Sequence, residues 1–407
     1  MSDVAVPNPV AVSSDPNRVL AAQRHERSLA GPVRGLWVLL AVVLSVKAIL
    51  LPTRHTTYPC FEAGSRCWWA EKNMYDFHEC GYEYRYSPTF AVAFSPLAAF
   101  PTAMGGVLWG LLNVGLLWWA LREFTGSLAP GIGGRNMELV FVLLALLGSI
   151  RGFWSAQSNT LVIAFVMAGA AALARRELWK AAFLLAIPVF IKVWPLAVVM
   201  LLAACWPRQL LWRCTAALAA LSALPFLTRP PGVVLWQYHN WYSAVTRQIH
   251  VRHDYRDVWT LWEWLAPPVS PQGYLALQLV SASAVLGLCL WQQRRAPTLQ
   301  HALTFVLGIW TAWQLALGPG TERNTFCLIA PLTAWGLLAS WRDHSETWPR
   351  RLLMLGGFGL IALFTFGIFE RKLVDRFPGA IAALPIGVLM FSLWLILHAR
   401  RWRAPSS

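Results

Sequence analysis

Long apolar runs alternate with short polar segments from residue 35 to residue 398. Stretches such as LLWWAL and AVVMLLAA are apolar on every side, which excludes the alternating pattern of a membrane β-barrel strand. An apolar run of about 20 residues has the length that crosses a bilayer as a helix. The pattern therefore predicts an all-α polytopic membrane protein with about 11–12 transmembrane helices. The candidate spans are residues 35–52, 88–103, 105–122, 136–150, 157–174, 181–204, 210–228, 273–293, 301–317, 324–341, 351–369 and 379–398.

The composition agrees with a membrane protein and excludes several other classes. Hydrophobic residues make up 57% of the 407 residues, charged residues make up 13%, and the mean hydropathy is +0.48. A water-soluble globular protein needs more charge than this. The seven cysteines are too few and too scattered to form a disulfide scaffold.

The net charge of +15 comes from basic residues that lie beside the apolar runs. Arginines in short hinges and at the tail follow the positive-inside rule, so the charge indicates topology and we expect no nucleic-acid binding. We predict a cytoplasmic polar tail at residues 1–34, one integral membrane domain at 35–398 and a cytoplasmic basic tail at 399–407. The expected location is the bacterial plasma (inner) membrane. Residues 1–30 lack the pattern of a removable signal peptide, so we expect the first span to be retained.

With both termini inside, the long loops 53–87 and 229–272 face the outside. Because each successive span changes sides, the same count of spans places the basic segment 175–180 outside, against the positive-inside rule. Either 136–150 is not a full span or this short loop breaks the rule.

Loop 53–87 has a pattern of apolar positions that predicts short amphipathic helices on the membrane face. It also holds Cys60, Cys67 and Cys80, so one disulfide is possible if the loop faces an oxidising space. Cys60 and Cys67 would be about 10 Å apart on one helix, which is too far for a bridge. Cys80 would therefore have to be one partner.

We expect no metal and no cofactor. Residues 250–257, HVRHDYRD, hold histidines and aspartates in the second long loop, which has the composition to line or cap a cleft. No third spacing completes a metal site there, and these side chains fit a solvated face equally well.

Several short polar motifs lie along the chain. Tyr84–Pro88 form a tyrosine-rich segment at the start of the second span, within the stretch 58–101. Gln157–Asn159, Ile191–Pro195 with Lys192, and the GPGTERNTF sequence of residues 318–326 come later. In this order and spacing the motifs resemble glycosyltransferase family 87, over about residues 35–340. The remaining matches are Ala63, Arg66 and Tyr75, and Ala156 at a position where the family has glycine.

The resemblance implies a fold and an activity. The fold is the C-type glycosyltransferase fold, and the activity is transfer of a hexose, mannose in particular, from a polyprenyl-phosphate-linked sugar donor. The acceptor is a lipid or a glycan at the extracytoplasmic face, and membrane lipids surround the protein.

One departure from the family concerns the general base. The resemblance implies an aspartate soon after the first span, and counting back from Tyr75 places it at about Thr57. We therefore predict that Glu62, the nearest carboxylate, is the catalytic residue that accepts the acceptor proton. Alternatively, Glu62 only pairs with Arg66 at i, i+4 on an amphipathic helix. A third reading is that the base is lost and the protein is a non-catalytic relative.

Lys192 and Arg85 are the candidates for binding the donor phosphate. Lys192 lies inside an apolar run, where a charge costs about 2.5–3.5 kcal/mol and is by default a functional-site hypothesis. Arg85 can hold a phosphate with two hydrogen bonds. The structural alternatives are a snorkelling or internally paired lysine and an interfacial arginine anchor.

Sugar or acceptor contacts are expected from five polar residues in the motifs. Asn159 has the alternative role of a helix cap, and the glycines that precede Glu322 could serve only a tight turn. The five residues are Tyr86, Gln157, Asn159, Glu322 and Arg323.

A secondary transporter or lipid flippase would also have about twelve spans and an intramembrane lysine. Its polar groups should gather at the bilayer midplane, whereas here the charges concentrate in an external loop. Two measurements separate the classes. Transfer of sugar from a lipid donor would indicate the enzyme, and uptake of a solute into proteoliposomes without such turnover would indicate a transporter.

Overall fold

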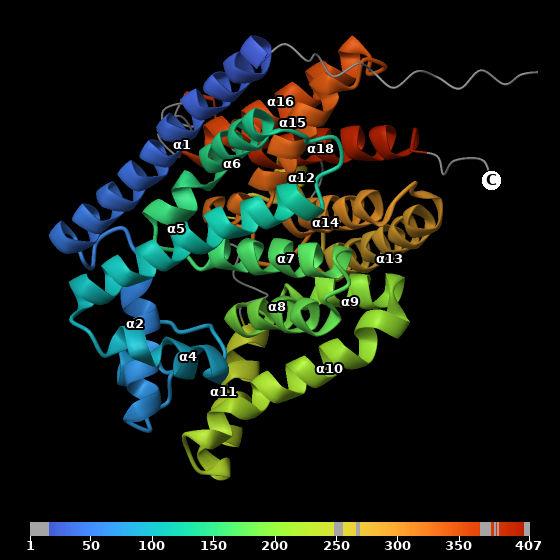
Figure 1. The fold of residues 1–407 in the computed structure, drawn as a ribbon. Coiled ribbons are helices and arrows are strands. Elements are labelled where there is room, and N and C mark those ends of the chain that lie inside the picture. Colours follow the sequence, from blue (N-terminus) through green and yellow to red (C-terminus); the bar gives the residue numbers. More distant parts are fainter. Residues whose placement is uncertain are drawn as a thin grey trace, which may run out of the picture.

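Helices make up most of the residues that the computed structural model describes, which are 16–247, 255–265, 269–366, 376–377, 380 and 382–402. No strand occurs among them. The chain runs back and forth between two ends of a helical bundle (Figure 1). The all-α prediction is therefore confirmed, and the protein is a multi-pass membrane protein.

Within the part of the chain that the structure describes, five helical segments are long and apolar enough to cross a membrane. They correspond to the predicted spans 35–52, 105–122, 136–150, 210–228 and 273–293, so the doubtful third of these has the length of a full span. The segments are Ala30–Leu50 within α1 (Pro16–Leu50), α5 (Thr102–Ser127), α6 (Arg135–Trp154), Pro207–Leu227, which comprises α10 (Pro207–Ala223) and η1 (Leu224–Leu227), and α13 (Pro271–Arg295).

Two predicted spans are not single crossings. The span 88–103 contains α4 (Pro88–Ala98), whose 11 residues extend only about 16 Å, against about 30 Å of hydrocarbon. The span 181–204 is divided into α8 (Leu178–Ile191) and α9 (Leu196–Cys205) by a hinge at residues 192–195. Prolines cause this break, because Pro188 lies inside α8 and Pro195 is the N-cap of α9.

The remaining helices of the bundle have 18 residues or fewer among the described residues. The predicted span 324–341 starts as a 3₁₀ turn, and parts of the spans 351–369 and 379–398 lie outside the described residues. These elements are α7 (Asn159–Ala174), α14 (Leu299–Ala316), η3 (Arg323–Leu328), α15 (Ala330–Arg342), α16 (Trp348–Thr365) and α18 (Ala383–Ala399).

Helix α7 forms the centre of the core and packs between α5 and α8. Its alanines and Gly169 are buried, so neighbouring backbones approach closely. A Cβ atom at Gly169 would come within 2.8 Å of Leu185 on α8, which explains the need for glycine there.

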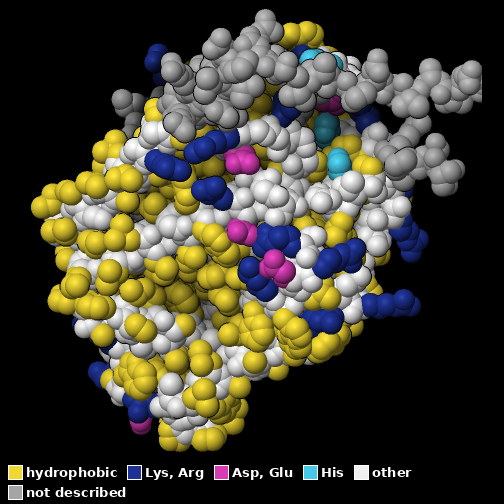
Figure 2. Space-filling model, viewed as in Figure 1, with side chains coloured by type: hydrophobic (Ala, Val, Ile, Leu, Met, Phe, Trp, Pro, Cys, Tyr) yellow, Lys and Arg dark blue, Asp and Glu magenta, His cyan; other side chains and the backbone are white. Residues whose placement is uncertain are grey.

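One end of the bundle, which we call the basic end, joins the loop 128–134 to the hinges after α7 and α15. Arg175 forms a 2.7 Å ion pair with Glu123 near the end of α5, and Arg342 donates a 3.3 Å hydrogen bond to the carbonyl of Gly133. Trp335 donates to the carbonyl of Pro130 at 3.0 Å. In Figure 2, Lys and Arg side chains gather at the middle right of the view, where Figure 1 places the C-terminal end of α7.

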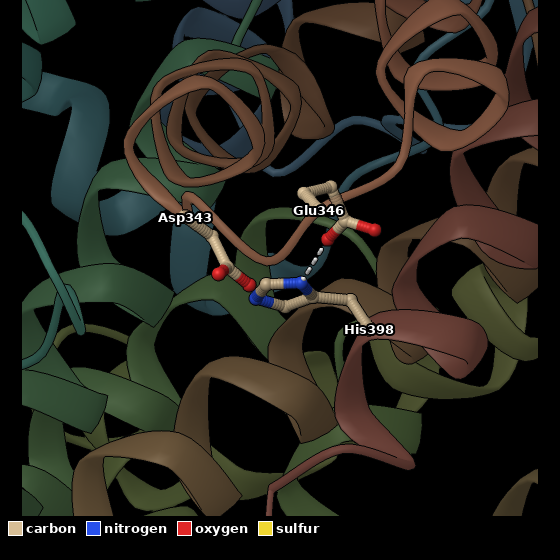
Figure 3. A group of neighbouring side chains, drawn as sticks. All are labelled: Asp343, Glu346 and His398. Atoms are coloured by element: carbon tan, nitrogen blue, oxygen red, sulfur yellow. Dashed lines mark hydrogen bonds and ion pairs between the residues drawn. The ribbon is translucent and has the colours of Figure 1, made fainter.

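A charge network around the buried Glu346 anchors the end of α18 at the basic end (Figure 3). His398 on α18 lies 2.8 Å from Glu346, and Arg401 pairs with Glu346 at 3.2 Å and with Asp343 at 3.0 Å. Among the described residues, Asp343, Glu346 and His398 form the group whose ligand atoms are close enough to hold a metal ion. Because Arg401 and Arg350 already neutralise the carboxylates, we interpret the group as a structural anchor.

The opposite end, which we call the site end, carries short helices from both long loops. Loop 53–87 forms α2 (Tyr58–Trp69) and α3 (Phe77–Cys80), which confirms the prediction of short helices. Loop 229–272 contains α11 (Pro231–Arg247) and α12 (Val258–Leu265). Gln237 of α11 donates a 2.6 Å hydrogen bond to the carbonyl of Lys72, so the two loops pack on each other.

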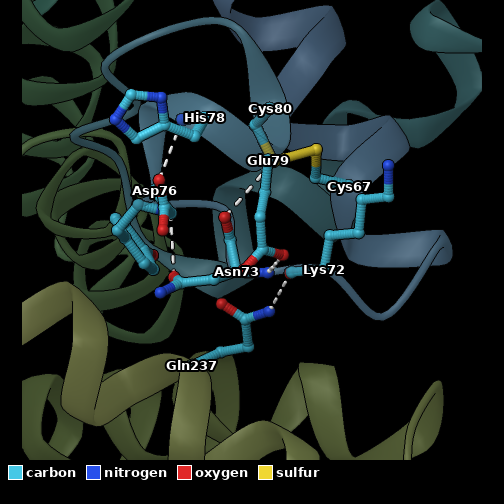
Figure 4. Close-up of a disulfide and its surroundings, with 9 residues drawn as sticks. Cys67, Lys72, Asn73, Asp76, His78, Glu79, Cys80 and Gln237 are labelled. Atoms are coloured by element: carbon cyan, nitrogen blue, oxygen red, sulfur yellow. Dashed lines mark hydrogen bonds between the residues drawn. A yellow bond between two sulfur atoms is a disulfide. The ribbon is translucent and has the colours of Figure 1, made fainter.

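A disulfide joins Cys67, near the end of α2, to Cys80, at the end of α3 (Figure 4). The expectation that Cys80 is one partner is therefore confirmed. Cys60 stays a free thiol, and burial raises its pKa to about 12.

The two irregular spans correct the predicted topology of residues 102–180. Since α4 does not cross, α5 begins at the site end and α7 finishes at the basic end, where Arg175 contacts Glu123. The hairpin of α8 and α9 returns to the basic end, so the later helices keep their predicted direction. The segment 175–180 then shares one end with the other basic hinges, and the apparent violation of the positive-inside rule disappears.

Candidate active site

The hinge between α8 and α9 brings Lys192 to the site end. Its backbone is extended, with φ −144° and ψ 143°, because the helix cannot continue through Pro195. Ser87, which caps α4, donates through its hydroxyl to the carbonyl of Phe190 at 2.6 Å. This contact fixes the tyrosine-rich segment against the residue two positions before Lys192.

Glu322 and Arg85 are close enough to Lys192 to act on its charge. Glu322 is the N-cap residue of η3 and is half-buried. Arg85 is 43% exposed and forms a 2.6 Å ion pair with Glu83, so part of its charge is already neutralised. The structure thus brings together three predicted site residues from three distant parts of the sequence.

Tyr86 is buried beside this group. Its carbonyl accepts a 2.8 Å hydrogen bond from the Tyr75 hydroxyl, and its own hydroxyl lies near Ser158 and within the electrostatic influence of Glu322. Burial raises the pKa of Tyr86 well above its usual range, so the hydroxyl stays protonated at neutral pH and can donate.

Asn324 connects three elements at the floor of the site. Its Oδ1 accepts hydrogen bonds from Arg151 Nε and Ser155 Oγ, both 3.2 Å, at the end of α6. Its carbonyl accepts a 3.1 Å bond from Asn159 Nδ2 at the start of α7. Asn324 therefore fixes the position of η3, which begins with Arg323 directly after Glu322. Our sequence reasoning missed Asn324, although a polar RNT sequence at the start of an expected span was a visible sign.

Thr57 belongs to the same network. Its backbone N–H donates to the carbonyl of Ser155 at 2.9 Å, and its hydroxyl donates to the same oxygen at 3.2 Å. The position where the family resemblance implies a catalytic aspartate therefore lies two hydrogen bonds from Asn324.

The turn before α7 has an unusual backbone and unused acceptors. Ala156 adopts φ +49°, the left-handed region that favours glycine, which accounts for the family's glycine at this position. Asn159 is not the helix cap, because Ser158 holds the N-cap position. Gln157 Oε1 and Asn159 Oδ1 are buried and find no hydrogen-bond donor among the described residues. Such acceptors suit the hydroxyls of a sugar.

Glu62 lies elsewhere on α2. Its Oε1 is 2.5 Å from Arg66 Nη2 and accepts a 3.0 Å hydrogen bond from Thr102 at the start of α5. Cys60, two residues earlier and so about 200° around the helix, faces Glu83 instead. The ion pair is the structural interpretation of Glu62, and its catalytic role stays a prediction.

The second long loop closes over the site end. The backbone N–H of Arg256 donates to the carbonyl of Thr321 at 2.8 Å, and Trp241 on α11 donates to the carbonyl of Arg85 at 3.4 Å. Asp257 is buried and accepts a 3.2 Å bond from the N–H of Thr260 in the first turn of α12. Most of the histidine-rich sequence, residues 250–254, lies outside the described residues.

Comparison with known proteins agrees with the motifs. Among solved structures, the chain is similar to ArnT from Cupriavidus metallidurans bound to undecaprenyl phosphate, with 14% identity and a TM-score of 0.36 over 90% of this chain and 78% of that chain. No curated protein matches. The model of glycosyltransferase family 87 matches residues 84–340, which is more than half of the chain and includes every motif from Tyr84 to Phe326. The chain therefore belongs to glycosyltransferase family 87.

Proposed function

We propose that the protein transfers a hexose, mannose in particular, from a polyprenyl-phosphate-linked donor to a lipid or glycan acceptor. The reaction takes place at the extracytoplasmic face of the bacterial inner membrane, and the site end is that face. The observation that carries the proposal is the convergence of Lys192, Arg85, Tyr86 and Glu322 at one end of a bundle that belongs to a glycosyltransferase family.

Each group has a role in the transfer. The bond between the sugar's anomeric carbon and the donor phosphate oxygen breaks, and a bond from the acceptor hydroxyl oxygen to that carbon forms. Lys192 and Arg85 stabilise the negative charge that the departing polyprenyl phosphate gains. Tyr86 donates a hydrogen bond, and Gln157 and Asn159 accept hydrogen bonds from sugar hydroxyls.

The acceptor hydroxyl loses its proton to a carboxylate, and two candidates exist. We propose Glu322, because it shares the surroundings of Lys192 and Tyr86 and caps a short helix held by Asn324. Glu62 is the alternative predicted from the sequence, but its Oε1 is already engaged by Arg66 and Thr102.

The test is transfer of radiolabelled mannose from polyprenyl-phosphate-mannose in membranes that contain the wild type, Glu322→Gln, Glu62→Gln or Thr57→Asp at equal protein level. General-base catalysis contributes about 10²–10⁴-fold, so we expect Glu322→Gln to lose at least a hundredfold in rate. Loss of turnover in Glu62→Gln alone would transfer the base assignment to Glu62.

A wild type that is silent with every polyprenyl donor would contradict the proposed function. Activity that appears only in Thr57→Asp would mean that this protein is a non-catalytic relative whose carboxylate has been lost.

A further inference from the structure

Helix α14 presents two buried polar atoms without partners on one face. Trp310 and Gln314 are four residues apart, so they lie on the same side of the helix. Both side chains are fully buried, and neither Trp310 Nε1 nor Gln314 Oε1 has a hydrogen-bond partner among the described residues. A buried polar atom without a partner destabilises the fold, so a pair on one face requires an explanation.

The orientation of the Gln314 amide is fixed by its neighbours. Its Nε2 donates a 3.1 Å hydrogen bond to the carbonyl of Pro319, which can only accept. The Oε1 atom must therefore be the unpartnered atom. The loop fits closely here, because a Cβ atom at Gly318 would come within 2.5 Å of the Gln314 amide, and Thr321 donates a 3.1 Å bond to the Gln314 carbonyl.

This face of α14 adjoins the candidate site on two sides. The Trp310 ring lies 6.1 Å from the ring of Trp194, which is in the hinge two residues after Lys192. Gln314 packs under Pro319 and Thr321, and Thr321 immediately precedes Glu322. Trp310 thus contacts the hinge that holds Lys192, and Gln314 contacts the loop that holds Glu322.

We propose that Trp310 and Gln314 bind hydroxyl groups of the sugar that the donor carries, and that they help to determine which sugar is accepted. One atom is a donor and the other an acceptor, and a polyhydroxylated ring offers both functions on neighbouring carbons. The donor sugar is the fitting occupant because it is attached to the phosphate that Lys192 is proposed to bind. The inference rests on the proposed function, and it extends the site to a helix that none of the sequence motifs include.

The test measures binding as well as turnover. Affinities of purified wild type for polyprenyl-phosphate-mannose and for bare polyprenyl phosphate give the part of the affinity that is due to the sugar. Trp310→Phe removes the N–H and keeps an aromatic ring, and Gln314→Met removes the amide with little change of volume. We expect each variant to lose about tenfold or more of the sugar-dependent affinity, with unchanged affinity for bare polyprenyl phosphate.

The chain supplies matched controls. Trp394 Nε1 and both amide atoms of Gln292 are also buried and unpartnered among the described residues, on α18 and α13. Trp394→Phe and Gln292→Met repeat the same substitutions at buried positions, except that Gln292 has no counterpart of the Gln314 hydrogen bond to Pro319. We expect both to keep the wild-type difference between the two lipids.

The outcomes distinguish failure of the α14 inference from failure of the proposed function. A wild type that binds and turns over the mannose donor while both α14 variants keep the full sugar-dependent affinity overturns this inference and leaves the proposed function intact. Weakened affinity for the acceptor alone would assign α14 to the other substrate and would also overturn it. A wild type that binds neither lipid contradicts the proposed function itself.

Discussion

Asn324→Ala tests whether the position of η3 controls catalysis. The substitution removes an oxygen that accepts from the Arg151 guanidinium and from the Ser155 hydroxyl, both at 3.2 Å. A neutral hydrogen bond contributes about 1 kcal/mol and one from a charged donor about 1.5–3 kcal/mol, and both distances are at the long end of the range. We therefore expect the free energy of unfolding to fall by about 2–3 kcal/mol.

The larger effect should be on turnover. Without this contact, η3 loses its two side-chain hydrogen bonds to the end of α6, and Glu322 at its start can shift relative to Lys192. A displacement of about 1 Å at a reacting group can cost about a hundredfold in rate, so kcat should fall by tenfold to a hundredfold. The KM for the donor should change less, because Lys192 and Arg85 are held by other elements.

The assay is steady-state transfer in detergent micelles, at a temperature where thermal unfolding shows the variant to be folded. Thr304→Val is the control, since it removes one buried hydrogen bond, of 3.1 Å to the carbonyl of Leu128, at the basic end. It should lose about 1 kcal/mol of stability and keep the wild-type kcat. If Asn324→Ala keeps the wild-type kcat as well, η3 does not position the base and the reasoning is refuted.

Three further substitutions test the fold by thermal unfolding of the purified protein. Ala156→Gly relieves a left-handed residue that costs about 1–2 kcal/mol, so it should raise stability slightly without loss of activity; a drop in stability would mean that the turn is not strained. Gly105→Ala would place a Cβ atom 1.8 Å from the Tyr58 hydroxyl oxygen and should destabilise by about 1–3 kcal/mol, whereas Gly115→Ala, with open space around it, should not. Replacing Cys67 and Cys80 by serine should remove about 2–4 kcal/mol, and a reducing agent should lower the wild type to the same level.

The apolar pattern was sufficient to predict the class of fold because it depends on a strong physical requirement. A helix is the structure that satisfies its own backbone hydrogen bonds in lipid, so long apolar runs can be read directly. Two other arguments succeeded as well: the amphipathic pattern predicted the short helices of loop 53–87, and helix geometry predicted the role of Cys80 in the disulfide.

The pattern could not show where a helix stops short. Residues 88–103 and 181–204 are as apolar as true spans, yet Pro101 and Pro195 divide or end their helices. Whether a proline bends a helix or ends it depends on the packing of neighbouring elements, which a hydropathy pattern does not contain. The unexpected position of the basic segment 175–180 was the sign that the predicted topology was wrong.

The candidate site was predicted in part for a similar reason. Motifs identified Lys192, Arg85, Gln157 and Glu322 without any information on distance, and the tertiary fold brings these segments to one end. Proximity along the sequence was a poor guide to the base, because Glu62 is five residues from Thr57 but faces α5. Asn324 and Gln314 were missed because each is polar within a stretch that was read as a transmembrane span.

The contacts around Thr57 suggest how a carboxylate could be lost at that position and retained in the site. Thr57 is bonded to the carbonyl of Ser155, the Ser155 hydroxyl is bonded to Asn324, and Asn324 lies two residues after Glu322. Both positions therefore belong to one network at the end of α6 and the start of α7. Since Thr57 still occupies its place in this network, the geometry of the site does not depend on an aspartate there. Under the proposed function, the carboxylate that the reaction needs is then Glu322, whose charge acts on Lys192. The prediction is that activity depends on Glu322 and does not require an aspartate at position 57.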